Sequence, residues 1–317
     1  MTAASQIRIG FYGTPGFALS FLKDLYSNGF KIVYVVTQPP RVSGRGKKIK
    51  LSPVHQWALD QKIEVFSPKI INDEDFIKKI KNIKIDFNVV VAYGNILTEK
   101  VINLPKYQSL NVHASNLPRW RGAAPIQRAI LSDDKQTGVS VMRVDEKLDS
   151  GPVILGKLIK IQKDENFDSL SKKIITYGKE ILKKSLFSII ENVYDYKHQN
   201  SDGITYAKKI QKSEYRISWN KSAHDVNCQI RAFSLKPGAW TCFRNSESRI
   251  KILKASVISD QDISDKGNYD IGEITKNFQV KCVKDFLKIE IIQKEGKKPT
   301  SVKDFINGNE ITDFFFI

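Results

Sequence analysis

The chain has 317 residues, 41% of them hydrophobic, and a formal net charge of +17. This length favours two domains, because single hydrophobic cores rarely grow beyond about 250–300 residues, and the composition excludes an intrinsically disordered chain. Three widely spaced cysteines and four histidines argue against a disulfide framework, a zinc site or a histidine-rich centre, so no metal is expected.

The first part of the chain alternates strand-like and helix-like segments. An apolar run at 7–12 leads through a Gly-Thr-Pro-Gly turn into an amphipathic stretch at 17–28, and a second apolar run follows at 31–37. A strand–helix–strand unit of this kind builds a parallel sheet. The same patterns predict a helix at 72–80 and strands at 82–92, 110–113 and 138–144. We therefore expect an α/β domain with an open, twisted sheet.

The second part has a different pattern. A long helical periodicity at 168–192 precedes a polar, turn-rich segment at 194–203, which indicates a linker. Beyond it, short apolar or alternating runs between turn residues predict strands at 239–243, 250–257, 272–274, 279–283 and 287–292. Helices are predicted at 223–233 and 302–306. Many short strands with turn signals are typical of a small β-barrel.

The net charge has two interpretations. A large positive surplus favours a polyanionic partner such as nucleic acid or an anionic membrane. However, 40 of the 51 basic residues are Lys, and an A+T-rich genome would produce the same bias. Met1 to Gln6 are too few and too polar for a signal peptide, and the chain has no apolar run of about 18 residues. A soluble, cytosolic protein without a membrane partner is expected.

Two polar side chains stand at the end of one predicted strand. Asn111 and His113 are two residues apart, so strand geometry places both on one face. Ligands of open α/β sheets bind outside the carboxyl ends of the strands. An amide and an imidazole at this edge could together donate hydrogen bonds to a developing oxyanion. Taken alone, His113 would more often be a core or turn histidine.

An acidic turn follows a later predicted strand. Asp149 precedes Gly151 and Pro152, which mark a turn. Alone, Asp149 would more often be a turn residue than a catalytic one. Near His113, however, its carboxylate could hold the imidazole in the charged form.

A short loop concentrates positive charge after the second predicted strand. It carries five basic side chains within ten residues: Arg41, Arg45, Lys47, Lys48 and Lys50. Its two glycines allow close approach to a phosphate backbone, and Arg can form paired hydrogen bonds with phosphate. The alternative is a solvated surface loop.

The glycines near the start do not form a dinucleotide-binding motif. Gly10, Gly13 and Gly16 are evenly spaced, but the GxGxxG pattern is absent. Thr37 and Gln38 end the second predicted strand where an acidic residue would bind a ribose. A nicotinamide cofactor is therefore rejected.

Longer motifs resemble those of the folate-dependent formyltransferase family. The stretch NVHASNLPRWRGAAPIQRAI pairs Asn-x-His with Leu-Pro-x-x-Arg-Gly, and LDSGP places an Asp 36 residues beyond the His. The segments FYGTPGFAL, TQPPRVSGRGKKIKLSPV and VVVAYGNIL resemble the branch of that family that formylates methionyl-tRNA, as do YAKKI, ISW and IRAFSLKPGAW in the second half. The similarity runs nearly from end to end.

The resemblance implies a fold, an activity and partners. The fold would be a Rossmann-like open parallel-sheet domain over 1–193, a linker over 194–206 and an OB-like, tRNA-binding β-barrel over 207–317. The activity would be transfer of the formyl group of 10-formyltetrahydrofolate to the amino group of methionine on initiator tRNA, for translation initiation. Relatives are usually monomers, so no obligate protein partner is expected. The absence of a transit peptide favours the cytoplasm of a bacterium.

The resemblance also implies roles for individual residues. The catalytic trio of the family maps on Asn111, His113 and Asp149. Folate contacts are implied at Val91, Ala92, Tyr93, Gly94, Ser115, Asn116, Leu117 and Pro118. The basic loop would contact the tRNA acceptor stem through Arg41, Arg45, Lys47, Lys48 and Lys50. The chain departs from the family pattern at Asn95, Asn116 and Pro152.

Three alternatives are weighed against this function. Another folate-dependent formyltransferase, or a formyl-folate hydrolase, would share the trio but lack the basic loop. A non-catalytic tRNA-binding protein would not need an intact Asn111, His113 and Asp149. A general nucleic-acid-binding protein would explain the charge but not the motif at 111–125.

Overall fold

The computed structural model describes residues 3–43, 48–71, 73–264, 267–309 and 314–317. The chain divides into two units. The first comprises Met1–Pro125, Gln136–Lys160 and Ser171–Lys208, and the second comprises Ile126–Lys135, Ile161–Leu170 and Lys209–Ile317. The segment expected as a linker therefore lies within the first unit. In the described part of the chain, no helix is both long enough and apolar enough to cross a bilayer.

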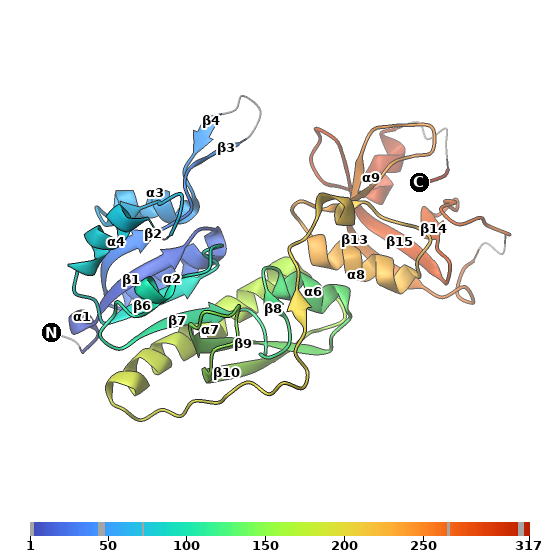
Figure 1. Ribbon diagram of the computed structural model, residues 1–317. Coiled ribbons are helices and arrows are strands. Elements are labelled where there is room, and N and C mark those ends of the chain that lie inside the picture. The colour runs from blue at the N-terminus through green and yellow to red at the C-terminus, as the bar shows by residue number, and fades with distance from the viewer. Residues whose placement is uncertain (1–2, 44–47, 72, 265–266, 310–313) are drawn as a thin grey trace. The chain divides into compact units, whose positions relative to one another are not determined.

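A seven-stranded sheet forms the centre of the first unit (Figure 1). Its strands are β1 (Arg8–Gly13), β2 (Lys31–Val36), β5 (Glu64–Phe66), β6 (Phe87–Val91), β7 (Gln108–His113), β9 (Gln136–Arg143) and β10 (Val153–Lys160). The spatial order is β10-β9-β7-β6-β1-β2-β5. The five strands from β7 to β5 are parallel, whereas β9 is antiparallel to β7 and β10 to β9. The expected open α/β sheet is confirmed, with one antiparallel edge.

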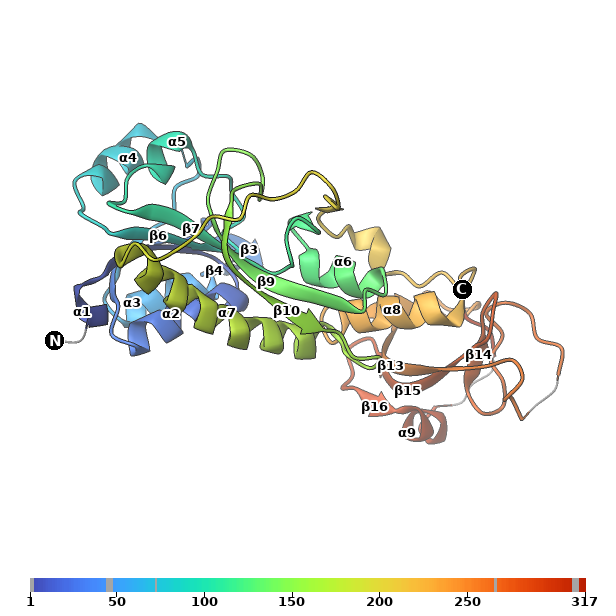
Figure 2. The same ribbon diagram turned by 90° about the horizontal axis from the view of Figure 1, so that it is seen from below.

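Helices cover both faces of this sheet, as Figure 2 shows. The helices of this unit are α1 (Ala3–Gln6), α2 (Gly16–Ser27), α3 (Pro53–Asp60), α4 (Glu74–Lys81), α5 (Glu99–Ile102) and α7 (Phe167–Ile190), of which residues 167–170 belong to the second unit. Helix α6 (Pro125–Leu131) belongs to the second unit from Ile126 onward. On one face α2 lies beside α7, and Lys183 pairs with Asp24 over 3.0 Å. The core on the α4 and α5 side contains Phe76, Ile80 and Val101.

The predicted helices form where the sequence places them, for local reasons. Helix α2 buries Ala18, Phe21, Leu22 and Leu25, a spacing of three and four residues that lines one helical face. Helix α4 begins after Asp73, whose carboxylate accepts a hydrogen bond from the Phe76 amide over 2.9 Å. These local signals explain why the first unit was predictable.

The basic loop belongs to a β-hairpin that the sequence did not predict. Strands β3 (Arg41–Ser43) and β4 (Lys48–Lys50) pair in antiparallel fashion, and Figure 1 shows the hairpin extending from the end of β2. Arg41 stands opposite Lys50 in this pairing. Like charges placed opposite each other on a hairpin repel.

The second unit holds an antiparallel sheet of five strands. They are β12 (Ala239–Thr241), β13 (Ile250–Ile258), β14 (Gln279–Lys281), β15 (Phe286–Lys294) and β16 (Thr300–Ser301), in the order β12-β13-β15-β14, with β16 also on β15. Helices α8 (Ala223–Phe233) and α9 (Val302–Asn307) and the 3₁₀ helix η1 (Lys212–Tyr215) accompany it. Register shifts around Lys254 interrupt the pairing of β13 with β15, a feature that bends a strand. The small β domain is confirmed, although residues 272–274 form only isolated bridges rather than a strand.

Candidate active site

The structure brings Asn111, His113 and Asp149 together. Asn111 and His113 lie at the end of β7, and Asp149 lies in the loop between β9 and β10. The Asn111 amide nitrogen donates to Asp149 Oδ1 over 3.1 Å, and His113 Nδ1 lies 3.5 Å from Asp149 Oδ2. His113 is only 5% exposed. An amide, an imidazole and a carboxylate thus meet at the carboxyl edge of the parallel strands.

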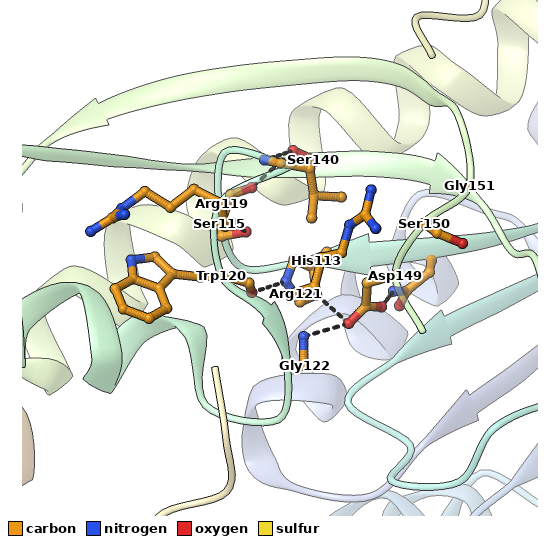
Figure 3. Close-up of polar contacts among 12 residues, drawn as sticks. His113, Ser115, Arg119, Trp120, Arg121, Gly122, Ser140, Asp149, Ser150 and Gly151 are labelled. Carbon is orange, nitrogen blue, oxygen red and sulfur yellow. Dashed lines mark hydrogen bonds and ion pairs between the residues drawn. The ribbon is translucent and has the colours of Figure 1, made fainter. Parts of the chain in front are cut away.

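Two backbone groups complete this arrangement, as Figure 3 shows. His113 Nε2 lies 2.8 Å from the Trp120 carbonyl oxygen, and the Gly122 amide donates to Asp149 Oδ2 over 2.8 Å. Both ring nitrogens of His113 therefore face oxygen acceptors. A neutral imidazole can donate to only one of these two acceptors at a time.

The backbone is strained at three places around the candidate site. Ala92, Trp120 and Asp149 have φ values of 46°, 63° and 47°, in the left-handed region that side chains disfavour. Such backbone conformations are kept only where surrounding contacts stabilise them, and they are frequent at functional sites. Two of these residues, Trp120 and Asp149, contact His113 directly.

The expected folate residues at the end of β6 form an exposed turn at the same sheet edge. Val91 and Tyr93 are buried, whereas Ala92 and Gly94 are exposed. The Thr14 hydroxyl donates to the Tyr93 carbonyl over 3.1 Å and holds this turn beside the end of β1. An exposed turn at this edge could offer backbone donors and acceptors to a heterocycle.

The second expected folate segment has a different environment. The Ser115 hydroxyl donates to the Arg119 carbonyl over 2.6 Å and so closes its own loop. The cavity beside this loop has a volume of about 380 Å³ and is lined by Asn116, Leu117, Pro118, Ser140, Val153, Gly156, Leu158, Lys197, His198, Gln199 and Asn200. Neither the catalytic trio nor the turn at 91–94 lines this cavity. Of the two expected folate segments, the second therefore borders this cavity, through Asn116, Leu117 and Pro118.

Three of the basic residues expected to contact tRNA, Arg41, Lys48 and Lys50, lie on strands β3 and β4. Arg41 and Lys50 are exposed, and Arg41 donates to the Gln38 side-chain oxygen over 3.3 Å. Lys48 begins β4. Arg45 and Lys47 lie outside the described residues.

A second polar cluster lies in the second unit. Side-chain atoms of Asp133, His224 and Cys228 lie within 4.8 Å of one another, a grouping that could hold a metal ion. His224, for which the sequence showed no partner, lies 3.0 Å from Asp133. Lys135 and Arg231 also contact the Asp133 carboxylate. Because these two cations already compensate the carboxylate, we interpret the cluster as an ion-pair network.

The sequence did not single out four residues at the candidate site. Trp120 and Gly122 lie inside the longest motif, but only the structure shows that their backbone groups contact His113 and Asp149. Gln199 and Thr205 lie in the segment expected as a linker, yet they bond to the backbone of Asp149 and Trp120. Contacts between residues so far apart in the chain leave no local sequence pattern.

Family models and curated relatives match almost the whole chain. The model described as "Formyl transferase" matches residues 7–186, and "Formyl transferase, C-terminal domain" matches residues 209–310. A methionyl-tRNA formyltransferase from Sulfurihydrogenibium sp. is 40% identical over 96% of this chain and 98% of its own length. One from Pelagibacter ubique is 39% identical over 96% of both chains.

Solved structures show the same fold at lower identity. A sugar 3N-formyl transferase, WlaRD, solved in the presence of dTDP and 5-N-formyl-THF, is 24% identical with a TM-score of 0.65, covering 92% of this chain and 99% of its own. HypX from Aquifex aeolicus in complex with tetrahydrofolic acid is 14% identical with a TM-score of 0.62, covering 98% of this chain and 50% of its own. With both family models matched in order, this chain belongs to the formyl transferase family.

Proposed function

We propose that this chain transfers the formyl group of 10-formyltetrahydrofolate to the free amino group of methionine on initiator tRNA. The observation that carries the proposal is the contact of Asn111, His113 and Asp149 at one sheet edge. It is supported by 40% identity to a methionyl-tRNA formyltransferase over nearly the full length of both chains. The named relatives are bacterial, so we place the reaction in bacterial translation initiation.

In this proposal the methionine amine attacks the formyl carbon directly. A new carbon–nitrogen bond forms, the bond from the formyl carbon to the folate nitrogen breaks, and the proton lost by the amine balances the proton gained by that nitrogen. Ser115 and Ser140, two residues with hydroxyl groups close to His113 in the sequence or in the sheet, donate to backbone carbonyls rather than to a base. Neither has the activating partner that a covalent nucleophile needs.

Asn111 and His113 would stabilise negative charge on the formyl oxygen. An amide nitrogen has two N–H groups, and Asn111 directs one of them to Asp149, which leaves the second for an oxyanion. The Nε2 group of His113 is held by the Trp120 carbonyl over 2.8 Å. For His113 to donate to substrate, the formyl oxygen must therefore compete with, or share, this backbone acceptor.

Asp149 would act as the counter-charge and the proton acceptor. Its Oδ2 atom lies 3.5 Å from His113 Nδ1, a separation longer than a strong hydrogen bond. The carboxylate therefore stabilises the imidazolium by charge. Through a water molecule it can also accept the proton that the amine loses.

The β3–β4 hairpin would hold the acceptor. Arg41 and Lys50 are exposed and stand opposite each other. Their mutual repulsion would be relieved by a phosphate backbone between or beside them, and phosphate contacts supply much of the affinity for nucleic acid. Arg45, Lys47 and Lys48 would add to this contact.

The experiment is a formyl-transfer assay with radiolabelled 10-formyltetrahydrofolate. Methionyl initiator tRNA, glycinamide ribonucleotide, a nucleotide-linked amino sugar and water compete as acceptors. Label on the tRNA, lost in His113→Ala, supports the proposal. Label that passes only to a small acceptor or to water contradicts the proposed substrate, and no transfer to any acceptor contradicts the proposed activity.

A further inference from the structure

The segment after α7 runs along the candidate active site. We call residues 197–207 the strap. Lys197 and Val153 exchange two backbone hydrogen bonds of 2.9 Å. At the other end, β11 (Tyr206–Ala207) pairs in parallel with β8 (Arg121–Gly122). Both anchors lie in the first unit, as does the whole strap. The strap therefore belongs to the body of this unit.

Gln199, in the middle of the strap, uses all of its side-chain hydrogen-bonding capacity. Its amide nitrogen donates to the Asp149 carbonyl over 2.9 Å and to the Gly151 carbonyl over 2.7 Å. Its amide oxygen accepts from Arg121 Nε over 3.0 Å and from Nη2 over 2.7 Å. Because only the nitrogen can donate to carbonyls and only the oxygen can accept from a guanidinium group, the partners fix the orientation of the amide.

These bonds hold the backbone from which the Asp149 carboxylate projects. Asp149 has a φ of 47°, a conformation that other contacts must maintain. Its carboxylate accepts from Asn111 and from the Gly122 amide, so a small backbone rotation would break both bonds. Gln199 fixes the carbonyls of Asp149 itself and of Gly151, two residues along.

Thr205 fixes the backbone on the other side of His113, at Trp120 and Arg121. Its hydroxyl oxygen accepts from the Trp120 amide over 2.9 Å, and its carbonyl accepts from the Arg121 amide over 2.9 Å. Trp120, with a φ of 63°, directs its carbonyl to His113 Nε2. The strap therefore supports the acceptors on both ring nitrogens of His113.

From these contacts we infer that Gln199 is a positioning residue for formyl transfer: it acts through Asp149 and does not touch the substrate. One part of this inference, the expected fall in kcat, rests on the proposed function. Its structural consequence, loss of the Asp149–Gly122 hydrogen bond, can be measured without any substrate. A displacement of about 1 Å in a catalytic group lowers turnover by about 100-fold.

The test compares Gln199→Glu with Gln61→Glu. The first change keeps an acceptor for Arg121 but replaces the donor nitrogen by an oxygen facing two carbonyls. The second makes the same chemical change at an exposed position in the same unit. We expect kcat to fall about 100-fold in Gln199→Glu, with both KM values near those of wild type and a lower unfolding temperature, because two hydrogen bonds are lost. Gln61→Glu should match wild type throughout.

Hydrogen exchange at the Gly122 amide provides the independent measurement. This amide is bonded to Asp149 Oδ2, so its exchange rate reports where the carboxylate lies. It should exchange faster in Gln199→Glu than in wild type and Gln61→Glu. If Gln199→Glu fails to fold, the neutral Gln199→Met serves in its place, with the same expectations.

Two outcomes would overturn the inference. One is unchanged Gly122 exchange and unchanged kcat in the Gln199 variants. The other is a rise in KM with kcat unchanged, which would assign Gln199 to substrate binding. Failure of wild-type protein to formylate tRNA would contradict the proposed function instead, and the exchange measurement would still decide whether Gln199 positions Asp149.

Discussion

Asp149 Oδ2 accepts a hydrogen bond of 2.8 Å from the backbone amide of Gly122, which lies 27 residues earlier in the chain. The same oxygen faces His113 Nδ1, and the other carboxylate oxygen accepts from Asn111. The carboxylate is thus oriented by one backbone and one side-chain donor. The position of the carboxylate relative to His113 depends on this set of contacts.

Replacing Asn111 by Ala removes one donor for the developing oxyanion and one hydrogen bond to Asp149. We expect kcat to fall about 10²–10³-fold. Steady-state assays with both substrates at saturating concentrations would measure this loss, and the unfolding temperature would check that the variant is folded. Turnover close to wild type would exclude Asn111 from the catalytic machinery.

Gly122→Ala should reduce both stability and turnover. Gly122 has a φ of 117°, and a Cβ atom there would lie 2.9 Å from the Ala207 carbonyl oxygen, so backbone would have to move. We expect this steric clash to destabilise the fold by about 1–3 kcal/mol, in addition to the strain of the left-handed backbone. Urea unfolding and kcat would be measured together.

Gly296→Ala is the matched control for Gly122→Ala. Gly296 has a φ of 74°, but a Cβ atom there would meet nothing within 4 Å. This variant should therefore show only the backbone strain, about 1–2 kcal/mol, with kcat unchanged. Equal losses of stability in the two variants would show that the contact with Ala207 is unimportant.

The double variant Arg41→Ala, Lys50→Ala should bind tRNA more weakly. Both side chains are exposed on the hairpin. We expect KM for tRNA to rise, kcat to change little, and the slope of log KM against log salt to fall by about one for each phosphate that the variant no longer neutralises. The control Lys79→Ala, Lys81→Ala removes two exposed charges from α4. If both double variants change the slope equally, the hairpin has no special role.

Stability should decrease above pH 10 because of a buried tyrosine. Burial raises the pKa of Tyr34 to about 12, whereas a tyrosine in the unfolded chain ionises near pH 10. The unfolded state therefore loses this proton first, so the stabilisation is complete below about pH 10 and is lost as the pH rises towards about 12. The loss from Tyr34 approaches about 1.4 kcal/mol per pH unit in that window.

Urea unfolding of wild type and Tyr34→Phe between pH 8 and pH 11.5 would test this expectation. The variant loses the hydrogen bond of 3.2 Å to Asn88, so it should be less stable at pH 8. Above pH 10 its stability should fall less steeply than that of wild type. Parallel pH profiles would show that Tyr34 is not the group responsible.

The sequence by itself was sufficient for the elements whose signals are local. The helical spacing of Ala18, Phe21 and Leu25 predicted α2, and apolar runs predicted β1, β2 and β6. The separation of two residues between Asn111 and His113 predicted that they share one face of a strand. Such features depend on neighbours in the chain, because helix and strand periodicities are properties of consecutive residues.

Local sequence patterns did not predict the hairpin formed by β3 and β4. Its strands are three residues each, with a single apolar residue in each strand, which is too short a run for an alternating pattern to be recognised. The antiparallel edge formed by β9 and β10 was also not predictable, since strand direction depends on how the chain crosses the sheet.

What the sequence determined about this protein is the kind of chemistry, an amide, an imidazole and a carboxylate on an α/β sheet. What only the tertiary structure decided is how these groups are held. Gln199 reaches the Asp149 carbonyl across 50 residues of chain, and Thr205 reaches the Trp120 amide across 85. Side-chain bonds to distant backbone need only a polar residue of the right length, and many residues of the strap meet that condition. Folding alone selects which of them lie within hydrogen-bond distance of the site.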